Sequence, residues 1–294
     1  MSDRWFHTHT RSLKGKTVAI TGATGGIGNA LCRQLASLDA SLILLDRNQT
    51  KSAALRAALL HEYPDCVITC IPVDLEQMST VKTALNTLKA HRVDIFLHNA
   101  GAYSIPRHLC DTGFDNVFQI NFVSPYYMIR ELLPSLREVN GQVVAVGSIA
   151  HNYSESDPTD VDFSTRKQAS KVYGNAKRFL MFSLYELFRN ETDVKLSVTH
   201  PGITFTNITA HYPKLIFAVI KHPMKVIFMK PRKASLSILQ GLFDDCDYHE
   251  WIGPRWWDIW GLPKKRVLRT VSVEESYAIG QTADTIYQTL KAGR

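Results

Sequence analysis

The sequence has few cysteines and no long apolar run. Its 294 residues include five cysteines, an odd number scattered along the chain, which excludes a disulfide framework and is typical of a reducing compartment. The first residues, Met1 to Phe6, lack the apolar core of a signal peptide, and nowhere do 18 apolar residues follow one another. Neither a secretory signal nor a transmembrane helix is therefore expected. The sequence predicts a cytoplasmic protein, or one bound at the periphery of a membrane.

Clusters that would indicate a metal or nucleic-acid site are missing as well. Cys66 and Cys70 lie in a strand-like run, and no second pair of ligands follows at a usable spacing, so we expect no metal. The formal net charge is +7, but the basic residues are spread, with clusters only at Lys230–Lys233 and Lys264–Arg266. Without a recognition module this charge does not indicate nucleic-acid binding.

The chain is long enough for one large domain or two average ones. Hydrophobic residues make up 45% of it and charged residues 21%, as in ordinary globular proteins. No internal repeat or low-complexity linker divides it, and open α/β sheets often reach this length as one domain. We therefore expect a single domain over residues 1–294, with an N-terminal arm at 1–15 and a C-terminal extension at 251–294.

Apolar strands alternate with helical segments along most of the chain. Strands are predicted at Thr17–Thr21, Ser41–Leu45, Cys66–Val73, Val93–Leu97, Gln142–Gly147 and Lys195–Thr199. Helices are predicted at Ile27–Leu38, Gln49–Tyr63, Gln77–His91, Phe114–Arg137 and around Tyr173. Beyond Pro201 the pattern loosens, with a further helix at Arg232–Phe243 and a last short strand at Glu250–Gly253. Such strands indicate an α/β fold, a doubly wound parallel sheet in three layers.

A glycine-rich turn, Thr21-Gly-Ala-Thr-Gly-Gly-Ile-Gly28, follows the first strand and opens the first helix. Its glycines allow a tight bend and a close approach of the backbone to a pyrophosphate, whose charge meets the amide groups of the helix N-terminus. In this context the turn predicts a Rossmann-type dinucleotide site. The residues expected to bind the dinucleotide here are Gly22, Thr24, Gly26, Ile27 and Gly28.

Asp46 ends the second strand, 18 residues after Gly28. A carboxylate at this place accepts hydrogen bonds from an adenosine ribose and repels a 2′-phosphate, which favours NAD. The adjacent Arg47 could instead pair with that phosphate. Because the turn itself supplies no positive charge, the sequence favours NAD over NADP.

Tyr173 and Lys177 stand four residues apart in a helical stretch. Residues at this spacing share one helix face, so the Lys177 ammonium can lie near the Tyr173 phenol and lower a pKa that is otherwise about 10. A phenol tuned in this way can pass a proton near neutral pH. Together with the glycine-rich turn, the pair predicts dinucleotide-dependent redox chemistry.

From about Lys16 to Thr206 the sequence resembles the short-chain dehydrogenase/reductase family, in its compact one-domain branch that includes retinol and hydroxysteroid dehydrogenases. The matching motifs are the glycine-rich turn, Asp74-Leu75, His98-Asn99-Ala100-Gly101, Gln119-Ile-Asn121-Phe, Val146-Gly-Ser148, the Tyr173 and Lys177 pair, and His200-Pro-Gly-Ile-Thr-Phe-Thr206. Two positions depart from the pattern, because His98 replaces an asparagine and Gly147 replaces a more usual serine.

The resemblance implies a catalytic group of Asn121, Ser148, Tyr173 and Lys177. Ser148 would donate a hydrogen bond to the substrate oxygen while Tyr173 exchanges the proton. Lys177 would also hold the nicotinamide ribose, and Asn121 would hold a water that links Lys177 to solvent. The further cofactor contacts that the resemblance implies are Asp74, Leu75, Asn99, Ala100, Gly101, Tyr173, Lys177, Pro201, Gly202, Thr204 and Thr206.

Ser148 and Tyr173 are 25 positions apart, more than in most members of the family. The extra piece, His151–Gln168, is polar and rich in aspartate, and we expect a surface loop. His151 is expected near the mouth of the pocket, and His200 as a packed residue at a strand end.

The apolar run Lys214–Lys230, punctuated by lysines, occupies the place of the family's substrate lid. We expect a lid over residues 207–231 and an apolar substrate. The same run suits a membrane headgroup boundary, so peripheral membrane contact stays open. The family also often pairs through the helices near Phe114–Arg137 and Gln168–Asn190, so a homodimer is possible.

These observations predict an NAD(P)-dependent oxidoreductase that interconverts a hydrophobic secondary alcohol and ketone, such as a steroid, retinoid or other lipid-like molecule. One alternative is an NADPH-dependent carbonyl reductase, if Arg47 outweighs Asp46. Others are an epimerase of the same family and a non-catalytic protein that senses a dinucleotide. The complete catalytic group argues against the last alternative.

Overall fold

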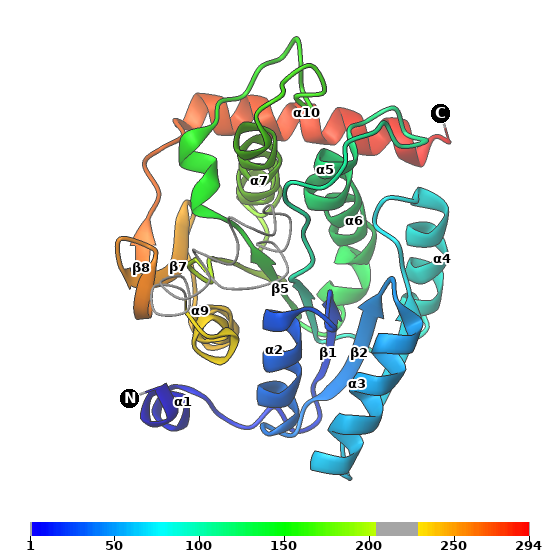
Figure 1. Cartoon of the computed structure of the whole chain (residues 1–294), viewed down its shortest axis with the longest axis vertical. Coiled ribbons are helices and arrows are strands. Elements are labelled where there is room, and N and C mark those ends of the chain that lie inside the picture. The colour runs from blue at the N-terminus through cyan, green and yellow to red at the C-terminus, as the bar shows by residue number, and fades with distance from the viewer. Residues whose placement is uncertain (1, 204–228, 294) are drawn as a thin grey trace, which may run out of the picture.

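The computed structural model describes residues 2–203 and 229–293, which form an eight-stranded sheet with helices on both faces (Figure 1). The strand order is β3-β2-β1-β4-β5-β6-β7-β8. All neighbours pair in parallel except β7 and β8, which pair antiparallel. The predicted α/β fold with a doubly wound parallel sheet is thus confirmed. The strands span Thr17–Thr21 (β1), Ser41–Asp46 (β2), Ile68–Pro72 (β3), Ile95–His98 (β4), Gln142–Val146 (β5), Lys195–Thr199 (β6), Glu250–Trp256 (β7) and Trp260–Val267 (β8).

One apolar core lies between the sheet and the helices on each of its two faces. Successive residues of a strand face opposite sides, so Val18 and Ile20 pack with one core while Ala19 packs with the other. The first core lies under α2 (Gly26–Ala36), α3 (Gln49–Glu62) and α9 (Pro231–Phe243). The second lies under α4 (Met78–Lys89), α6 (Ser124–Arg137) and α7 (Ala169–Leu187).

The segment expected as one helix from Phe114 to Arg137 is broken near its start. A short α5 (Asn116–Phe118) leads into one π-helical turn, η1 (Gln119–Val123), before α6 begins. The side chain of Asn121 explains the break, because its Nδ2 donates to the carbonyl oxygens of Val117 and Ala102, both at 2.8 Å. Such single π-turns are frequent at functional sites.

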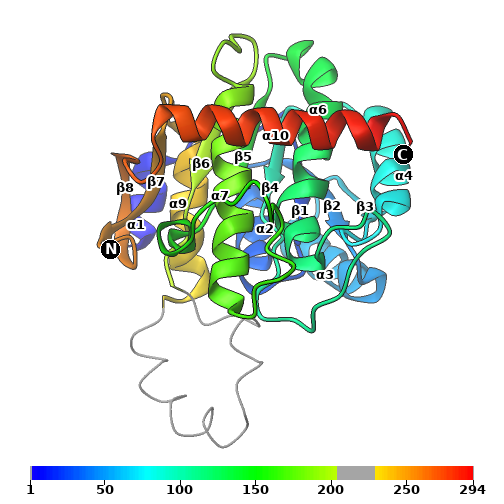
Figure 2. The ribbon, with the colours of Figure 1, turned by 90° about the horizontal axis from the view of Figure 1, so that it is seen from above.

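The C-terminal part holds more regular structure than expected. The strand predicted at Glu250–Gly253 is not the last one, because β7 turns back into the edge strand β8, and α10 (Val273–Lys291) follows. Helix α10 lies across α7 and α6 (Figure 2), the helices at which the resemblance suggests a homodimer. The buried Arg178 of α7 joins it by two hydrogen bonds to the Glu275 carboxylate, at 2.8 and 2.7 Å.

The N-terminal arm also contains a helix, α1 (Ser2–His9), which packs against α9 and buries Trp5. His7 and His9 lie exposed on it. Among the described residues, no helix has the length and apolar character needed to cross a membrane.

Candidate active site

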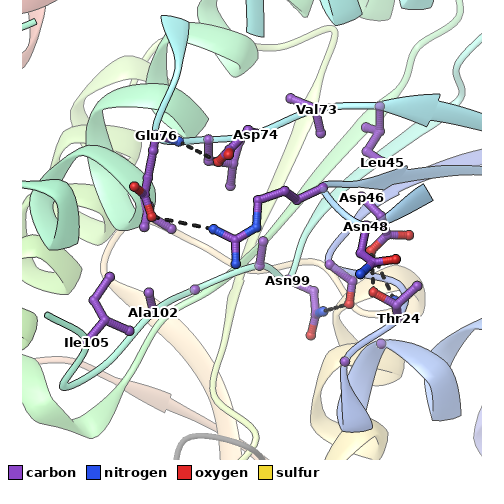
Figure 3. A pocket seen from close by; sticks show the side chains of 18 of the residues that line it. Thr24, Leu45, Asp46, Asn48, Val73, Asp74, Glu76, Asn99, Ala102 and Ile105 are labelled. Carbon is purple, nitrogen blue, oxygen red and sulfur yellow. Dashed lines mark hydrogen bonds and ion pairs between the residues drawn. The ribbon is translucent and has the colours of Figure 1, made fainter. Parts of the chain in front are cut away.

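The carboxyl ends of the central strands meet at one edge of the sheet. Thr21 lies beside His98 in the β1–β4 pair, and Val146 beside Thr199 in the β5–β6 pair. The strand order reverses between β1 and β4, and an open α/β sheet has a crevice at such a point. A cleft of about 720 Å³ opens there, and Figure 3 shows part of its lining.

The glycine-rich turn presents bare backbone to this cleft. Gly22 has a φ of +69°, and a Cβ atom on it would lie 2.9 Å from the Ala100 Cα. A Cβ on Gly28, in the first turn of α2, would lie 2.1 Å from the Gly22 carbonyl oxygen. A side chain at either position would fill the space that the turn leaves open. The open backbone at a helix N-terminus therefore fits the pyrophosphate of a dinucleotide.

The Asp46 carboxylate holds the turn in place. Its Oδ1 accepts hydrogen bonds from the backbone nitrogen of Thr24 at 3.1 Å and from the Thr24 hydroxyl at 2.9 Å (Figure 3). Its Oδ2 accepts one from the Ser52 hydroxyl at 3.2 Å, and the residue is only 3% exposed. Asp46 thus has a structural task at the end of β2 in addition to any contact with a ribose.

Cationic side chains stand beside Asp46 at the rim. The Arg47 side chain is 69% exposed and lies 3.6 Å from the carboxylate of Glu76, which also lies 3.2 Å from His108. Lys51, in the first turn of α3, lines the same cleft. The sequence motifs did not indicate Lys51, Glu76 or His108 as parts of this site; Lys51 could have been found as a cation one helical turn beyond Arg47.

The structure brings together most of the residues predicted to bind the dinucleotide. Those that line the cleft are Gly22, Thr24, Gly26, Ile27, Gly28, Asp46, Arg47, Asp74, Leu75, Asn99, Ala100 and Gly101. Asn99 Nδ2 donates to the carbonyl oxygens of Thr21 and Gly22, at 3.2 and 3.1 Å, and so joins β4 to the turn.

Gly101 connects the cleft to the predicted catalytic group. A Cβ on Gly101 would lie 2.8 Å from the Asn121 Oδ1 and 3.6 Å from the Lys177 Nζ. The pKa of the half-buried Tyr173 is raised to about 12 because its hydroxyl is desolvated, while a hydrogen bond with Ser148 lowers it. The Tyr103 ring lies edge-on to Tyr173, with ring centroids 5.3 Å apart. Asn121, Ser148, Tyr173 and Lys177 thus form one group beside the cleft.

The expectation that Lys177 lowers the pKa of Tyr173 is wrong for this structure. The Lys177 Nζ donates to the Val146 carbonyl oxygen at 2.8 Å and lies 5.8 Å from the centroid of the Tyr173 ring. Lys177 is 2% exposed, and burial lowers its own pKa to about 7. A buried amine whose pKa is lowered in this way stabilises a phenolate less than an ordinary lysine does.

A comparison with protein families matches residues 16–214 to the short chain dehydrogenase family. The chain belongs to the short-chain dehydrogenase family. Among characterised relatives, a chloroplastic short-chain dehydrogenase of Brassica napus is 27% identical over 69% of this chain and 68% of its own length. Retinol dehydrogenase 13 of Homo sapiens is 27% identical over 68% of this chain and 62% of its own length.

Solved structures show the same fold. An uncharacterised protein from Mycobacterium paratuberculosis has a TM-score of 0.75 at 22% identity and covers 96% of each chain. A short-chain dehydrogenase from Sphingobium yanoikuyae in complex with NADPH has a TM-score of 0.60 at 20% identity, over 77% of this chain and 84% of its own. The described chain therefore has the nucleotide-binding fold of short-chain dehydrogenases.

His98, at the first departure from the family pattern, has a defined tautomer. The Thr21 Oγ1 accepts hydrogen bonds from the backbone nitrogens of Asn99 and Ala100, both at 3.1 Å, and contacts the His98 Nδ1 at 3.0 Å. Since a hydroxyl has one proton and two lone pairs, Thr21 must donate to Nδ1, which leaves the proton on Nε2. Burial and the nearby Lys177 keep the pKa of His98 far below its usual value. Nε2 is buried without a hydrogen-bond partner in the described part of the chain.

Gly147, the second departure, is explained by the helix above it. A Cβ on Gly147 would lie 2.7 Å from the Met181 Sδ and 3.0 Å from its Cγ. The glycine and the large Met181 of α7 therefore fit each other, and a serine would have to displace the sulfur.

The segment between Ser148 and Tyr173 is anchored rather than free. Phe163 is fully buried and packs with Val117 of α5 and Val172 of α7, and the Asn175 Nδ2 donates to the Val161 carbonyl oxygen at 2.8 Å.

The histidine at the start of this segment does not line the pocket mouth, contrary to expectation. His151 is fully buried, with its two ring nitrogens at 2.7 Å from the Ser148 carbonyl oxygen and 2.9 Å from the Thr270 hydroxyl. Burial lowers its pKa to about 4, so its role is structural.

Pro201 and Gly202 follow β6, outside the lining of the cleft. Gly202 has a φ of +78°, and a Cβ on it would lie 2.6 Å from the Ile259 carbonyl oxygen. His200 is 3% exposed and stacks on Trp251 at 5.1 Å, which confirms it as a packed residue. Thr204, Thr206 and the predicted lid, apart from residues 229–231, lie outside the described residues.

Proposed function

We propose that this short-chain dehydrogenase is an NAD(P)-dependent oxidoreductase that interconverts a hydrophobic secondary alcohol and a ketone. The observation that carries the proposal is the junction at Gly101, where a cleft with a bare glycine cradle meets Asn121, Lys177, Tyr173 and Ser148. Bound in the cleft, the nicotinamide dinucleotide supplies or accepts the hydride.

The side chains of this group handle the proton. Ser148, hydrogen-bonded to Tyr173, donates to the substrate oxygen and sets its position. Tyr173 gives a proton to that oxygen in reduction and takes one in oxidation. Lys177, with a pKa of about 7, changes its protonation state readily at neutral pH and passes the proton toward Asn121.

A lipid-like substrate is supported by the names of two relatives. Retinol dehydrogenase 13 is 27% identical to this chain, and the human polyprenol dehydrogenase is 24% identical over 67% of it. Retinol and polyprenols are apolar primary alcohols, so these names support an apolar substrate and do not bear on whether its alcohol is secondary. The Tyr103 ring beside Tyr173 gives an apolar substrate a surface next to the reacting oxygen.

The choice between NAD and NADP depends on Asp46 and Arg47. The sequence favours NAD because a carboxylate repels a 2′-phosphate. Against this, the Asp46 oxygens already accept three hydrogen bonds inside the protein, while the exposed Arg47 and nearby Lys51 face the rim. These contacts support a second candidate, an NADPH-dependent carbonyl reductase.

Calorimetric titration with NADH and with NADPH tests the cofactor and the choice between the candidates. If NADPH is preferred, Arg47→Ala weakens NADPH binding by tenfold or more, as expected for a lost charge-assisted hydrogen bond of about 1.5–3 kcal/mol. NADH binding then stays unchanged, and Glu76→Gln, which removes the carboxylate beside Arg47, strengthens NADPH binding. Equal NADPH binding by wild type and Arg47→Ala favours NAD.

Turnover is then measured by the absorbance of the reduced cofactor, with a panel of steroid, retinoid and long-chain alcohols and the corresponding ketones or aldehydes. Oxidation or reduction of one of them supports the oxidoreductase. Binding of a dinucleotide without turnover on any of them supports the non-catalytic sensor instead. Failure of both dinucleotides to bind rejects all of these functions.

A further inference from the structure

Three tryptophans stand exposed at the turn between β7 and β8. Trp256, Trp257 and Trp260 are 53%, 77% and 48% exposed. The chain has five tryptophans, and the other two, Trp5 and Trp251, are 6% and 2% exposed. We call the exposed three, with the turn that joins them, the tryptophan hairpin. Large apolar side chains gathered on a surface in this way indicate an interaction site.

The backbone of the hairpin keeps these rings together. Trp256 lies opposite Trp260 in the β7–β8 register, and the rings of Trp256 and Trp257 are 6.1 Å apart. Trp257 and Asp258 have φ values of +52° and +57°, which are uncommon for residues other than glycine. The tight turn therefore presents one aromatic patch at the edge of the sheet.

Basic side chains lie beside this patch. Between residues 251 and 269 the basic residues are Arg255, Lys264, Lys265, Arg266 and Arg269, and the single acidic residue is Asp258. The Lys233 Nζ lies 5.5 Å from the centroid of the Trp260 ring, and the Arg255 Cζ lies 5.7 Å from that of Trp256. Within the described chain no carboxylate forms an ion pair with Lys233, Arg255 or Lys264. The hairpin thus combines aromatic rings with basic residues, of which Lys265 pairs with Glu250 and Arg266 with Asp258, while the other cations near it are uncompensated in the part of the chain that the structure describes.

We propose that the tryptophan hairpin docks the protein on an anionic lipid bilayer. Tryptophan places its apolar ring and its N–H group at the level of the lipid headgroups. Each lysine or arginine near an anionic surface strengthens the attraction to it. An anionic bilayer satisfies both features at once, whereas a second copy of this basic surface would repel it.

The hairpin also lies next to the segment that follows β6. Both the Ile259 carbonyl oxygen and the Pro254 side chain abut Gly202, at 2.6 and 2.8 Å from the position of its Cβ. The Met229 backbone nitrogen donates to the Ile203 carbonyl oxygen at 3.1 Å. Docking at the hairpin therefore brings the catalytic edge of the sheet near the bilayer, where apolar alcohols dissolve.

Vesicle co-sedimentation tests the proposal without any cofactor or substrate, so that its failure is distinct from failure of the oxidoreductase. The vesicles are phosphatidylcholine alone or with phosphatidylglycerol. We expect binding to the anionic vesicles, weakened by salt, with a shift of tryptophan emission to shorter wavelength. Trp257→Ser lowers the partition coefficient by about tenfold, as expected for the loss of one buried aromatic ring. Lys264→Glu lowers it by at least about fivefold.

Tyr277→Ser is the matched control, because Tyr277 is 55% exposed on α10, away from the hairpin; it keeps full binding. Turnover of a water-soluble substrate stays unchanged in Trp257→Ser. Binding absent from anionic vesicles, or equal in wild type and Trp257→Ser, overturns the proposal. So does a concentration-dependent dimer in sedimentation equilibrium that Trp257→Ser abolishes, which assigns the patch to a second copy.

Discussion

The two ends of the cleft differ in how completely their buried polar groups are hydrogen-bonded. At the turn end, the Asp46 carboxylate is 3% exposed, and its oxygens accept three hydrogen bonds. At the catalytic end, Lys177 is 2% exposed with one hydrogen bond, and the His98 Nε2 has none within the described residues. The turn end is arranged for stability. The catalytic end keeps buried polar groups that cost stability, and one of them, Lys177, can exchange a proton near neutral pH; such groups are frequent at active sites.

The largest effect is expected from Tyr173→Phe, which removes the proton donor and leaves its ring beside Tyr103. Turnover should fall by roughly 10³-fold or more, because general acid–base catalysis contributes about 10²–10⁴-fold. Cofactor affinity by calorimetry should stay within about twofold. If the variant retains turnover, Tyr173 is not the proton donor, and this end of the cleft is not the catalytic end.

Asp46→Ala should destabilise the protein by about 2–4 kcal/mol, because it leaves the Thr24 and Ser52 donors unpaired in a buried place. Chemical denaturation measures the change in the free energy of unfolding. Asp46→Asn is the matched control, since its amide keeps an acceptor for Thr24, and should lose less. Equal stability of wild type and Asp46→Ala would show that the turn end is not held by this carboxylate.

Lys177→Met should lower turnover and yet stabilise the protein by about 1–3 kcal/mol near neutral pH, because a buried, desolvated amine is replaced by an apolar side chain. Folding lowers the pKa of Lys177 from its ordinary value of 10.5 to about 7. The unfolded chain therefore binds more protons between these two values, and wild-type stability gains a contribution that rises with pH over that window. Denaturation curves from pH 7 to about 10 should show this rise in wild type and in Tyr173→Phe but not in Lys177→Met.

His98→Asn, which restores the family's residue, should have the smallest effect. Its carboxamide oxygen can accept the Thr21 hydroxyl proton in place of Nδ1, so we expect a melting temperature close to that of wild type. His98→Leu leaves that hydroxyl without an acceptor and should cost about 1–2 kcal/mol. If thermal unfolding shows both variants equally damaged, the tautomer assigned to His98 is wrong.

The parallel part of the fold could be predicted because its strands are apolar throughout and its helices have a 3.6-residue period. The sequence of the β7–β8 hairpin does not show this apolar pattern. Pro254 and Pro263, which are cross-strand partners, usually argue against a strand. Pro263 is tolerated because β8 is an edge strand, and Pro254 because it lies beyond Ile252, the last β7 residue in register with β6. Helix α10 had a signal that was overlooked, since Ser272 and Glu275 have the spacing of a capping box, and the Ser272 hydroxyl accepts from the Glu275 nitrogen at 3.2 Å.

The candidate site could be predicted residue by residue from ordered motifs, but its electrostatics could not. Burial of Lys177 depends on the packing of α7 against β5, and the partnership of Asp46 with Ser52 depends on how α3 meets β2. The π-turn at Asn121 likewise follows from a hydrogen bond to Ala102, which is remote in sequence. Such contacts come from tertiary structure and leave no periodic trace in the sequence.

The hydrogen bonds between Arg178 and Glu275 also have a consequence during synthesis of the chain on the ribosome. The two residues are 97 positions apart, so at about 5–20 residues per second a ribosome adds Glu275 roughly 5–20 s after Arg178. During that interval the guanidinium of the catalytic helix has no carboxylate partner from α10. Every catalytic residue is therefore made before the helix that covers α7.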